Sequence, residues 1–376
     1  MKALHVITGL GVGGAEQQLR LLLGHLPVRC DVVTLANPGP VADALRSDGV
    51  RVAHLGMGGN RDLSALPRLA GLIRAGGYDL VHTHLYRACL YGRIAARLAG
   101  VRAVLATEHS LGETQIEGRR LTAGVRALYL AGERLGRTTI AVSPTVAERL
   151  RRWGVPGRRV RMIPNGIDAP RLRYDAVRRE EARAFYGIPQ DAYVVGGLGR
   201  LDRGKRFDLL VHALHQLPAD VRLLLVGGGC QEAALRRTAH DLGVADRVVL
   251  TGERPYLPAP RDRAPALASL LSAMDVLAAP SAEESFGLAV LEALAAGLPV
   301  LYTTCPAVDD LPPDSAPCAR RVGGGTDAYV RELLRLRAAG PGERAVPDAV
   351  RHYSIERTAG QLMDVYTAVL SGSTWK

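Results

Sequence analysis

Short apolar runs alternate with amphipathic segments along most of the chain. The run ALHVIT at 3–8 predicts a buried strand, and the segment 15–26, which follows a glycine-rich loop, predicts a helix. The first half continues in the same way, with a helix predicted at 63–75 and strands at 31–35, 79–84, 102–107, 138–143 and 161–164. This alternation is typical of a parallel sheet covered by helices on both faces.

A polar stretch over residues 169–190 interrupts the pattern and is predicted to be a linker or hinge. The alternation then begins again, with helices predicted at 207–217, 231–242 and 288–295 and strands at 193–198, 222–226, 248–251, 275–279 and 300–302. Near the end of the chain, apolar residues between Ile355 and Val369 follow helical spacing and predict a packed helix.

These elements predict an α/β fold with two doubly wound, Rossmann-like domains that face a central cleft. The expected boundaries are an N-terminal domain over 1–168, the linker over 169–190, a C-terminal domain over 191–354, and a helix over 355–376 that packs back towards the N-terminal domain. Ligands of such folds lie at the carboxyl ends of the strands, so candidate chemistry is expected in the loops there.

The charge of the chain is unevenly distributed. Its 376 residues carry a net charge of +11, with +13 through Pro189 (28 basic, 15 acidic residues) and −2 in the remainder (20 basic, 22 acidic). A basic first half fits an anionic partner such as a phosphorylated substrate or an acidic membrane surface, and a general preference for arginine explains it equally well. Aromatic residues make up only 5% and are not interleaved with basic ones, which disfavours a nucleic-acid protein that stacks bases.

Cysteine and lysine usage narrows the picture further. The five cysteines form no CxxC pair and no spaced Cys/His set, which disfavours a disulfide framework and a zinc site. Lys205 is the only lysine away from the chain ends, which suggests that a compact ammonium group is needed there. The sequence shows neither a signal-peptide layout nor an uncharged run long enough to span a bilayer. We therefore expect a cytoplasmic protein, and peripheral contact with the inner face of an anionic membrane stays open.

The glycine loop GLGVGG at 9–14 matches the pattern GxGxxG directly after the first predicted strand. A dinucleotide site also requires an acidic residue near the end of the second strand. That strand runs into Ala36-Asn37-Pro38, so nicotinamide or flavin binding is disfavoured. Two interpretations remain: close approach of the backbone to an anion at the helix start after Gly14, or a purely structural turn.

Two carboxylates and two cations follow strands of the second domain. Glu284 lies in a loop after the strand 275–279, and Glu292 lies on the helix that opens after Phe286-Gly287. Both carboxylates could bind hydroxyl groups of one ligand, while the free N–H groups at the helix start favour an anion. Arg200 and Lys205 follow the strand 193–198, where cations can neutralise a diphosphate. A Walker A loop is excluded because Arg206 stands where Ser or Thr is required.

Histidines end two strands of the first domain. His82 and His84 close the strand 79–84, and His109 follows the strand 102–107. Because parallel strands end at one edge of the sheet, these side chains are candidates for a ligand site, although single histidines are often structural. Metal ligation is only weakly indicated, since no further cysteine or carboxylate has ligand spacing.

With these motifs in order, the whole chain resembles glycosyltransferase family 4, the retaining nucleotide-sugar transferases of the GT-B fold. The segments that carry the resemblance are GGAE at 13–16, HTH at 82–84, TEH at 107–109, NGID at 165–168, GRL at 199–201 with Lys205, VGGG at 226–229, PSAEESFGL at 280–288, LEAL at 291–294 and YSIER at 353–357. The block at 280–294 is the most specific of them.

The resemblance implies a role for each candidate residue. His109 and Glu284 would be the catalytic residues, with His109 near the sugar and Glu284 holding sugar hydroxyls. The donor would be bound by Gly14, Arg200, Lys205, Phe286, Gly287, Leu288 and Glu292, and Gly13 and His84 are candidates on the acceptor side. The family reacts without a dedicated metal, so no metal or other cofactor is expected. A UDP-sugar is the favoured donor.

The acceptor and the biosynthetic context stay open. A cell-surface glycan, a lipid-linked intermediate or a secondary metabolite would each fit, as in polysaccharide or antibiotic biosynthesis. Ser285 stands where the family usually has glycine, and the segment 254–265 is a longer loop than usual, so both bear on donor identity. The alternatives are a same-fold epimerase or phosphorylase, a non-catalytic partner subunit that binds sugar nucleotides, and an NAD-dependent oxidoreductase.

Overall fold

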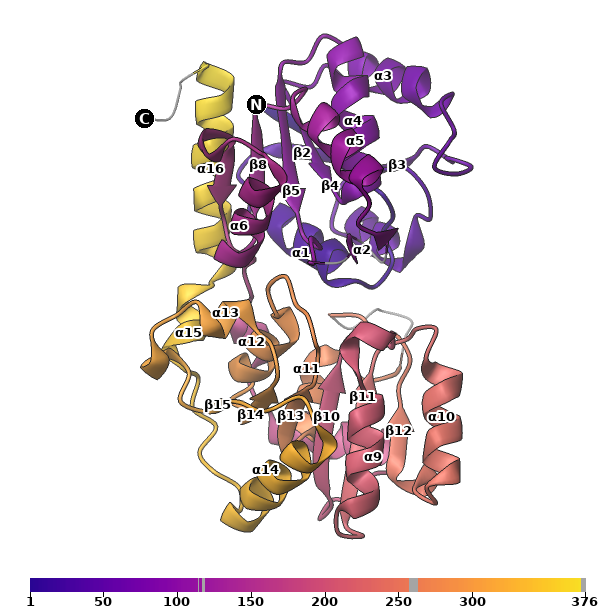
Figure 1. Ribbon diagram of the computed structural model, residues 1–376, viewed down its shortest axis with the longest axis vertical. Helices are drawn as coiled ribbons and strands as arrows, with labels where there is room; N and C mark the ends of the chain where they lie inside the picture. Colours follow the sequence, from indigo (N-terminus) through magenta and orange to yellow (C-terminus); the bar gives the residue numbers. More distant parts are fainter. Residues whose placement is uncertain (114, 117–118, 257–262, 373–376) are drawn as a thin grey trace. The chain divides into compact units, whose positions relative to one another are not determined.

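The computed structural model describes residues 1–113, 115–116, 119–256 and 263–372. The chain divides into two compact units: unit 1 comprises Met1–Gly166 with Ile355–Lys376, and unit 2 comprises Ile167–Ser354. Each unit is built on one parallel sheet with helices packed against it (Figure 1). The chain is therefore a pair of α/β units, as the alternation of apolar and amphipathic segments predicts.

The sheet of unit 1 has seven strands in the order β3-β2-β1-β4-β5-β8-β9. The strands are β1 Lys2–Ile7, β2 Arg29–Thr34, β3 Arg51–His54, β4 Leu80–His84, β5 Ala103–Glu108, β8 Thr138–Ala141 and β9 Val160–Met162. The helices are α1 Gly14–Leu23, α2 Gly39–Ser47, α3 Ala65–Gly76, α4 Tyr86–Leu98, α5 Ala123–Glu133, α6 Pro144–Trp153 and α16 Ile355–Ser371, and the short strands β6 Gln115–Ile116 and β7 Arg119–Arg120 form an antiparallel pair.

Alternation along the strands of unit 1 separates two apolar cores. On one face, Ile7 of β1 and Leu80 of β4 pack with α1 and α16. On the other face, Leu4, Val6 and Val81 pack with α3 and α4. The helix α16, yellow in Figure 1, thus belongs to unit 1 although it ends the sequence.

The sheet of unit 2 has six strands in the order β12-β11-β10-β13-β14-β15. They are β10 Tyr193–Leu198, β11 Val221–Val226, β12 Val248–Leu250, β13 Val276–Ala279, β14 Val300–Tyr302 and β15 Ala319–Arg321. The helices are α7 Ala169–Leu172, α8 Ala176–Phe185, α9 Asp208–Gln216, α10 Glu232–Asp241, α11 Leu267–Ala273, α12 Leu288–Ala295, α13 Pro306–Asp309, α14 Thr326–Ala339 and α15 Asp348–His352.

The polar stretch 169–190, predicted to be a linker or hinge, forms α7 and α8 inside unit 2. The Asp175 side chain caps α8 by accepting a hydrogen bond from the backbone N–H of Arg178 at 3.0 Å. The helix packs against α11, and its buried Arg183 donates to the carbonyl of Ala273 at 3.0 Å and to the carboxylate of Asp275 at 2.9 Å. The charged residues that suggested a linker therefore hold the C-terminal end of α11.

The sequence also predicts an irregular loop at 254–265 and no membrane-spanning segment. Of the segment 254–265, predicted to be an irregular surface loop, residues 257–262 lie outside the described residues. None of the helices in the described part of the chain combines the length and apolar character that crossing a membrane requires.

Candidate functional site

In unit 2 the strand order reverses between β10 and β13. From β10 the chain proceeds outward through β11 and β12, and from β13 it proceeds in the opposite direction through β14 and β15. The loops that follow β10 and β13 therefore leave the sheet in different directions, and such a switch point is where open α/β sheets bind ligands. Most of the predicted donor-binding residues lie in these two loops or on the helix that follows the second.

The loop after β10 is a tight turn that presents Lys205. Asp202 Oδ1 accepts hydrogen bonds from the backbone N–H groups of Gly204 at 3.0 Å and Lys205 at 3.2 Å, which fixes the 3₁₀ turn η2 Arg203–Lys205. Gly227 is needed beside this turn, because its φ is +140° and a Cβ there would collide with the backbone of Gly199. The exposed Arg200 lies in the same loop, with its Nη2 3.7 Å from Asp202 Oδ2.

The loop after β13 contacts this turn through both backbone and side chain. The backbone N–H of Ala282 donates to the carbonyl of Gly204 at 3.2 Å. The ammonium of Lys205 donates to a carboxylate oxygen of Glu284, and both side chains remain partly exposed, 24% and 18% respectively. The predicted cation and the predicted carboxylate therefore meet across the switch point, where they are accessible to a ligand.

The helix α12 begins at the same place with an open N-terminus. Gly287, its N-cap, has φ +103° and no side-chain cap, and a Cβ there would collide with the Sγ of Cys305. Phe286 is buried and packs edge-on against Tyr353, with ring centroids 5.1 Å apart. The N–H groups of Val290 and Leu291 donate to the carbonyl of Gly287, which leaves those of Leu288 and Ala289 without a partner in the helix, and the helix dipole adds to their attraction for an anion.

Glu292 lies on α12, close enough to Lys205 for the positive charge of that side chain to act on its carboxyl. Burial raises the pKa of the Glu292 carboxyl to about 7, and the positive charge of Lys205 opposes part of that rise. Burial, with a smaller contribution from the charge of Glu292, also raises the pKa of the Tyr256 phenol. A half-buried carboxylate of this kind is suited to accept hydrogen bonds from the hydroxyl groups of a ligand.

In unit 1 the strand order reverses between β1 and β4, and the predicted residues lie at that edge of the sheet. Gly13 is the N-cap of α1 without a side-chain cap, and Gly14 is the first residue of the helix. His84 is the last residue of β4 and is buried, and its Nδ1 lies 3.2 Å from Nε2 of the half-buried His109. The sequence-predicted residues of unit 1 thus collect at the carboxyl ends of β1, β4 and β5.

Sequence reasoning missed two members of this histidine cluster. His5 lies opposite His82 in the pairing of β1 with β4, and its Nδ1 lies 3.0 Å from His84 Nε2. The hydroxyl of Tyr366, which was predicted only to pack, lies 2.7 Å from His82 Nδ1. A histidine within the otherwise apolar strand 3–8 was the available signal. Among the described residues, His5, His82 and His84 are also close enough to hold a metal ion, with their ligand atoms within 4.8 Å of one another.

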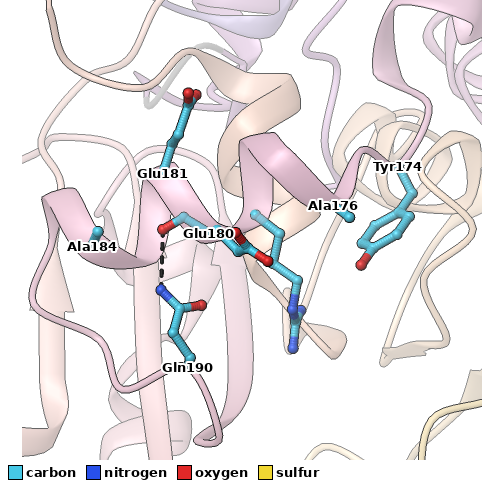
Figure 2. A pocket seen from close by; sticks show the side chains of 7 residues that line it. Tyr174, Ala176, Glu180, Glu181, Ala184 and Gln190 are labelled. Atoms are coloured by element: carbon cyan, nitrogen blue, oxygen red, sulfur yellow. Dashed lines mark hydrogen bonds between the residues drawn. The ribbon is translucent and has the colours of Figure 1, made fainter.

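In unit 2, a groove of about 560 Å³ runs along α8 (Figure 2). Its lining residues are Tyr174, Ala176, Arg179, Glu180, Glu181, Ala184 and Gln190. Across it, the Gln190 amide donates to the carbonyl of Glu180 at 3.1 Å, and Arg179 is paired with Asp275 at 2.8 Å. These two contacts hold α8 to the segments that pack against it, and no predicted site residue lines the groove.

Comparison with known proteins finds a matching family model for each half of the chain. Residues 12–171 match the model described as Glycosyltransferase Family 4, and residues 192–338 match the model described as Glycosyl transferases group 1. A relative from Xylanimonas cellulosilytica, a D-inositol 3-phosphate glycosyltransferase, is 30% identical over 87% of this chain and 83% of its own length. A second, from Mycobacteroides abscessus and with the same name, is 32% identical over 93% of this chain and 82% of its own.

Solved structures show the same fold. Anabaena HepE in complex with UDP and glucose aligns with a TM-score of 0.82 and 20% identity, over 98% of this chain and all of HepE. WaaG, a glycosyltransferase involved in lipopolysaccharide biosynthesis, aligns with a TM-score of 0.69 and 17% identity over 98% of this chain and all of WaaG. The two parallel α/β sheets are those of the GT-B fold, and the chain belongs to glycosyltransferase family 4, a family of retaining enzymes.

Proposed function

We propose that this chain transfers a sugar from a nucleotide diphosphate sugar to an acceptor hydroxyl, without a bound metal, and that unit 2 binds the donor. The observation that carries the proposal is the ion pair between Lys205 and Glu284 at the switch point of the sheet, beside the open N-terminus of α12. Cations and oriented N–H groups of this kind stabilise the charge that develops on a departing diphosphate.

Each side chain at this edge has a part in the proposed reaction. Lys205 and the exposed Arg200 neutralise the diphosphate, and the N–H groups after Gly287 bind its oxygens. Glu292 accepts hydrogen bonds from the ribose. When donor phosphate draws Lys205 towards itself, the carboxylate of Glu284 is released to hold the hydroxyls of the donor sugar, together with the backbone at 286–288. The pair thus holds both groups in place before substrate arrives.

In unit 1 we propose that His109 lies beside the sugar in the reaction centre. Gly14 offers backbone N–H groups to the donor phosphates, and Gly13 lies on the acceptor side. His109 is half-buried, and its ring nitrogen Nδ1 is itself buried and has no partner among the described residues, so we propose that bound substrate supplies the missing partner. A neutral imidazole there can donate or accept one hydrogen bond without adding charge to the centre.

A UDP-sugar is the proposed donor, and the structures of Anabaena HepE with UDP and glucose and with UDP-glucose support it. For the acceptor, the names of the relatives make D-inositol 3-phosphate the first compound to test. A phosphorylated acceptor also agrees with the basic first half of the sequence. Lipid-linked intermediates, which would place the enzyme at the inner face of a membrane, and small secondary metabolites form the other arms of the acceptor test.

A thermal-shift screen with UDP, GDP, ADP, TDP and CDP tests the donor site. A ligand at about a hundred times its Kd stabilises the folded protein by about 2.7 kcal/mol. We expect a clear shift with UDP and a larger one with a UDP-sugar. The variant Lys205→Ala should lose the shift, whereas Arg203→Ala, which removes an exposed cation from the same turn, should keep it. Equal shifts in both variants would contradict the diphosphate site.

Product analysis separates transfer from the same-fold alternatives. With a UDP-sugar and the right acceptor, NMR of the product should show the anomeric configuration of the donor. An epimerase would convert the donor without an acceptor, and a phosphorylase would require inorganic phosphate. A non-catalytic partner subunit would bind nucleotide and turn nothing over. Any of these three results would contradict the proposed transfer.

A further inference from the structure

A continuous line of hydrogen bonds crosses the α16-covered face of the unit 1 sheet and ends at His109. From His109 Nε2 it runs to His84 Nδ1 at 3.2 Å, and from His84 Nε2 to His5 Nδ1 at 3.0 Å. From His5 Nε2 it runs to the hydroxyl of Tyr366 at 3.4 Å, and from there to His82 Nδ1 at 2.7 Å. Its far end is the bond from His82 Nε2 to the hydroxyl of Thr107 at 2.7 Å.

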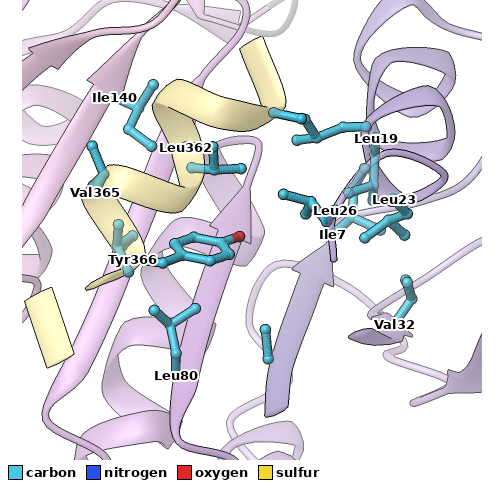
Figure 3. Packing of buried hydrophobic residues seen from close by; sticks show 14 of the residues in the cluster. Ile7, Leu19, Leu23, Leu26, Val32, Leu80, Ile140, Leu362, Val365 and Tyr366 are labelled. Carbon is cyan, nitrogen blue, oxygen red and sulfur yellow. The ribbon is translucent and has the colours of Figure 1, made fainter. Parts of the chain in front are cut away.

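The line is enclosed by protein along most of its length. His5, His82 and His84 are 0%, 1% and 2% exposed, and Tyr366 is fully buried. Figure 3 shows Tyr366 reaching from α16 towards the strands, among apolar side chains that include Leu80 and Leu362. Because a buried polar group without a partner is costly, the hydrogen bonds of this line constrain one another strongly.

The imidazoles of the line are neutral at physiological pH. Burial lowers the pKa of His5 to about 3 and that of His109 to about 4, and it also holds the pKa values of His82 and His84 well below their usual range. A neutral imidazole carries one N–H and one bare nitrogen. Each ring of the line must therefore donate on one side and accept on the other.

This condition couples the tautomers of the four rings. The single proton of the Tyr366 hydroxyl points either to His5 or to His82, so the line can be fully bonded in only two ways. In one, every imidazole carries its proton on Nδ1 and each donor points towards His109. In the other, every imidazole carries its proton on Nε2 and each donor points towards Thr107.

The Thr107 end favours the first arrangement. In the first arrangement, the Thr107 hydroxyl donates its proton to His82 Nε2, so this buried donor has an acceptor. In the second arrangement His82 donates to Thr107, and the hydroxyl proton of this buried residue has no acceptor among the described residues. An unmet buried donor is costly, so the protons should point from Thr107 towards His109.

A metal site is the other use that three clustered histidines suggest. Yet all six ring nitrogens of His5, His82 and His84 already have hydrogen-bond partners within the line. The rings of His82 and His84 also contact each other directly, with centroids 4.2 Å apart and planes tilted by 34°. A metal would have to displace these bonds, so the hydrogen-bonded line is the better account.

We propose that His5, His82, His84 and Tyr366 are positioning residues that hold His109 in its Nδ1–H tautomer, so that His109 donates a hydrogen bond to substrate instead of acting as a base. The proposal rests on the proposed function only for the identity of the substrate. His84, predicted on the acceptor side from sequence, acts here through His109. The free end of the line is His109 Nδ1, which is buried and without a partner in the described residues.

Nitrogen-15 NMR of ring-labelled histidines tests the tautomer without any activity. The chain has ten histidines, and the variant His109→Gln identifies the signals of His109. We expect the Nδ1–H pattern for His109 in the wild type. The variant Tyr366→Phe removes the hydroxyl that connects His5 with His82, and the His5, His84 and His109 signals should then show a mixture of tautomers.

The variant Tyr91→Phe is the matched control, because it removes another buried tyrosine hydroxyl of unit 1, one that donates to the carbonyl of Asn60 at 2.9 Å. It should leave the histidine signals unchanged. An Nε2–H pattern for His109 in the wild type would overturn the proposal, and so would unchanged tautomers in Tyr366→Phe. Stoichiometric zinc in the purified protein that is lost in His5→Gln would also overturn it, in favour of a metal site.

Kinetics adds a second reading once donor and acceptor are known. Tyr366→Phe should lower kcat roughly tenfold with little change in the KM of the donor, because it alters the tautomer of His109, which lies beside the sugar in the proposed reaction centre. Tyr91→Phe should match the wild type in both values. If the wild type transfers no sugar, the proposed function fails while the NMR result still decides the tautomer. If Tyr366→Phe keeps wild-type kcat, the positioning role fails while the transfer stands.

Discussion

The two sheets of this enzyme reverse strand order in the same way but carry polar groups of opposite character. In unit 2 these groups are charged, and Lys205 and Glu284 stand in loops beyond the strand ends, where each stays partly exposed. In unit 1 they are neutral, and His5 and His82 stand inside paired strands under α16. Burying a charge is costly unless its partners are buried with it, so charged groups that wait for a ligand stay partly exposed, whereas neutral imidazoles can be buried because they satisfy one another.

Unit 2 also buries one charge that has several partners. Arg183 is fully buried, and its guanidinium donates to Asp275 and to the carbonyls of Ala273, Gln190 and Ala192. The buried line of unit 1 has no such excess of partners. Each ring nitrogen of His5, His82 and His84 has one partner, and His109 Nδ1 has none among the described residues. We therefore expect the contact between α8 and α11 in unit 2 to depend on charge pairing, and the histidine line of unit 1 to depend on the order of its protons. The predictions below test that contrast.

The largest effect is expected from Arg183→Met. The change leaves the Asp275 carboxylate with one partner fewer and several carbonyls without donors, which should cost about 3–5 kcal/mol of stability. Differential scanning calorimetry should show the Tm lowered by about 6–20 °C. The control Arg178→Ala removes an exposed arginine of the same helix and should shift the Tm by about 2 °C at most. A small shift with Arg183→Met would show that unit 2 does not depend on this charge pair.

The next effect is on turnover. Glu284→Gln keeps the size of the side chain but removes the charge that pairs with Lys205, so we expect kcat to fall about a hundredfold. Thermal melts should show that the fold is intact. Glu232→Gln removes an exposed carboxylate that pairs with Arg236 on α10 and should leave the rate unchanged. A wild-type rate with Glu284→Gln would remove this residue from the proposed centre.

The contrast between the units also explains what the sequence could predict. The helix α12 and the strand β14 have the predicted bounds. Their residues are apolar except for Glu292, and they are bounded by Gly287 before the helix and by Gly297 and Pro299 between the two elements. The loops after β10 and β13 could be recognised because their charged residues and glycines are close in sequence to the strand ends. Local spacing was therefore sufficient to assign the candidate residues of unit 2 to these loops and to α12, and their role in binding a donor stays a prediction.

The rest depends on contacts between distant residues. His5 is paired with His82 only once β1 lies beside β4, and no local pattern fixes that strand order. The hydroxyl of Tyr366 meets His82 across 284 positions of sequence. The charged residues of α8 suggest a solvent-exposed linker when the sequence is considered alone. In the structure, Arg179 and Arg183 donate instead to carbonyls of the neighbouring helix α11. The Asp175 cap was the local signal for α8.

A moderate effect should appear in the pH dependence of nucleotide binding. The pKa of Glu292 is raised to about 7, so its carboxyl becomes protonated as the pH falls from 8 to 6. If the ionised carboxylate binds the ribose, the affinity for UDP should fall about tenfold over this range, because the ionised fraction of Glu292 falls about tenfold. Calorimetric titration at both pH values measures it. Glu292→Gln should bind more weakly at pH 8 and should lose this part of the pH dependence, while titration of the nucleotide itself stays. Equal pH profiles for both proteins would contradict the ribose role.

The smallest effect is expected from removing metal ions. Lys205, Arg200 and the N-terminus of α12 supply the positive charge that a metal would otherwise bring to the diphosphate, and the histidines of unit 1 are already bonded to one another. Incubation with EDTA should therefore leave the transfer rate unchanged.

A loss of activity with EDTA would contradict this prediction, and the metal that restores the rate would indicate which unit binds it. Restoration by Mg²⁺ would indicate a cation on the donor diphosphate, since Mg²⁺ prefers oxygen ligands. Restoration by Zn²⁺ but not Mg²⁺ would indicate the imidazoles of unit 1, and it should then disappear in His5→Gln.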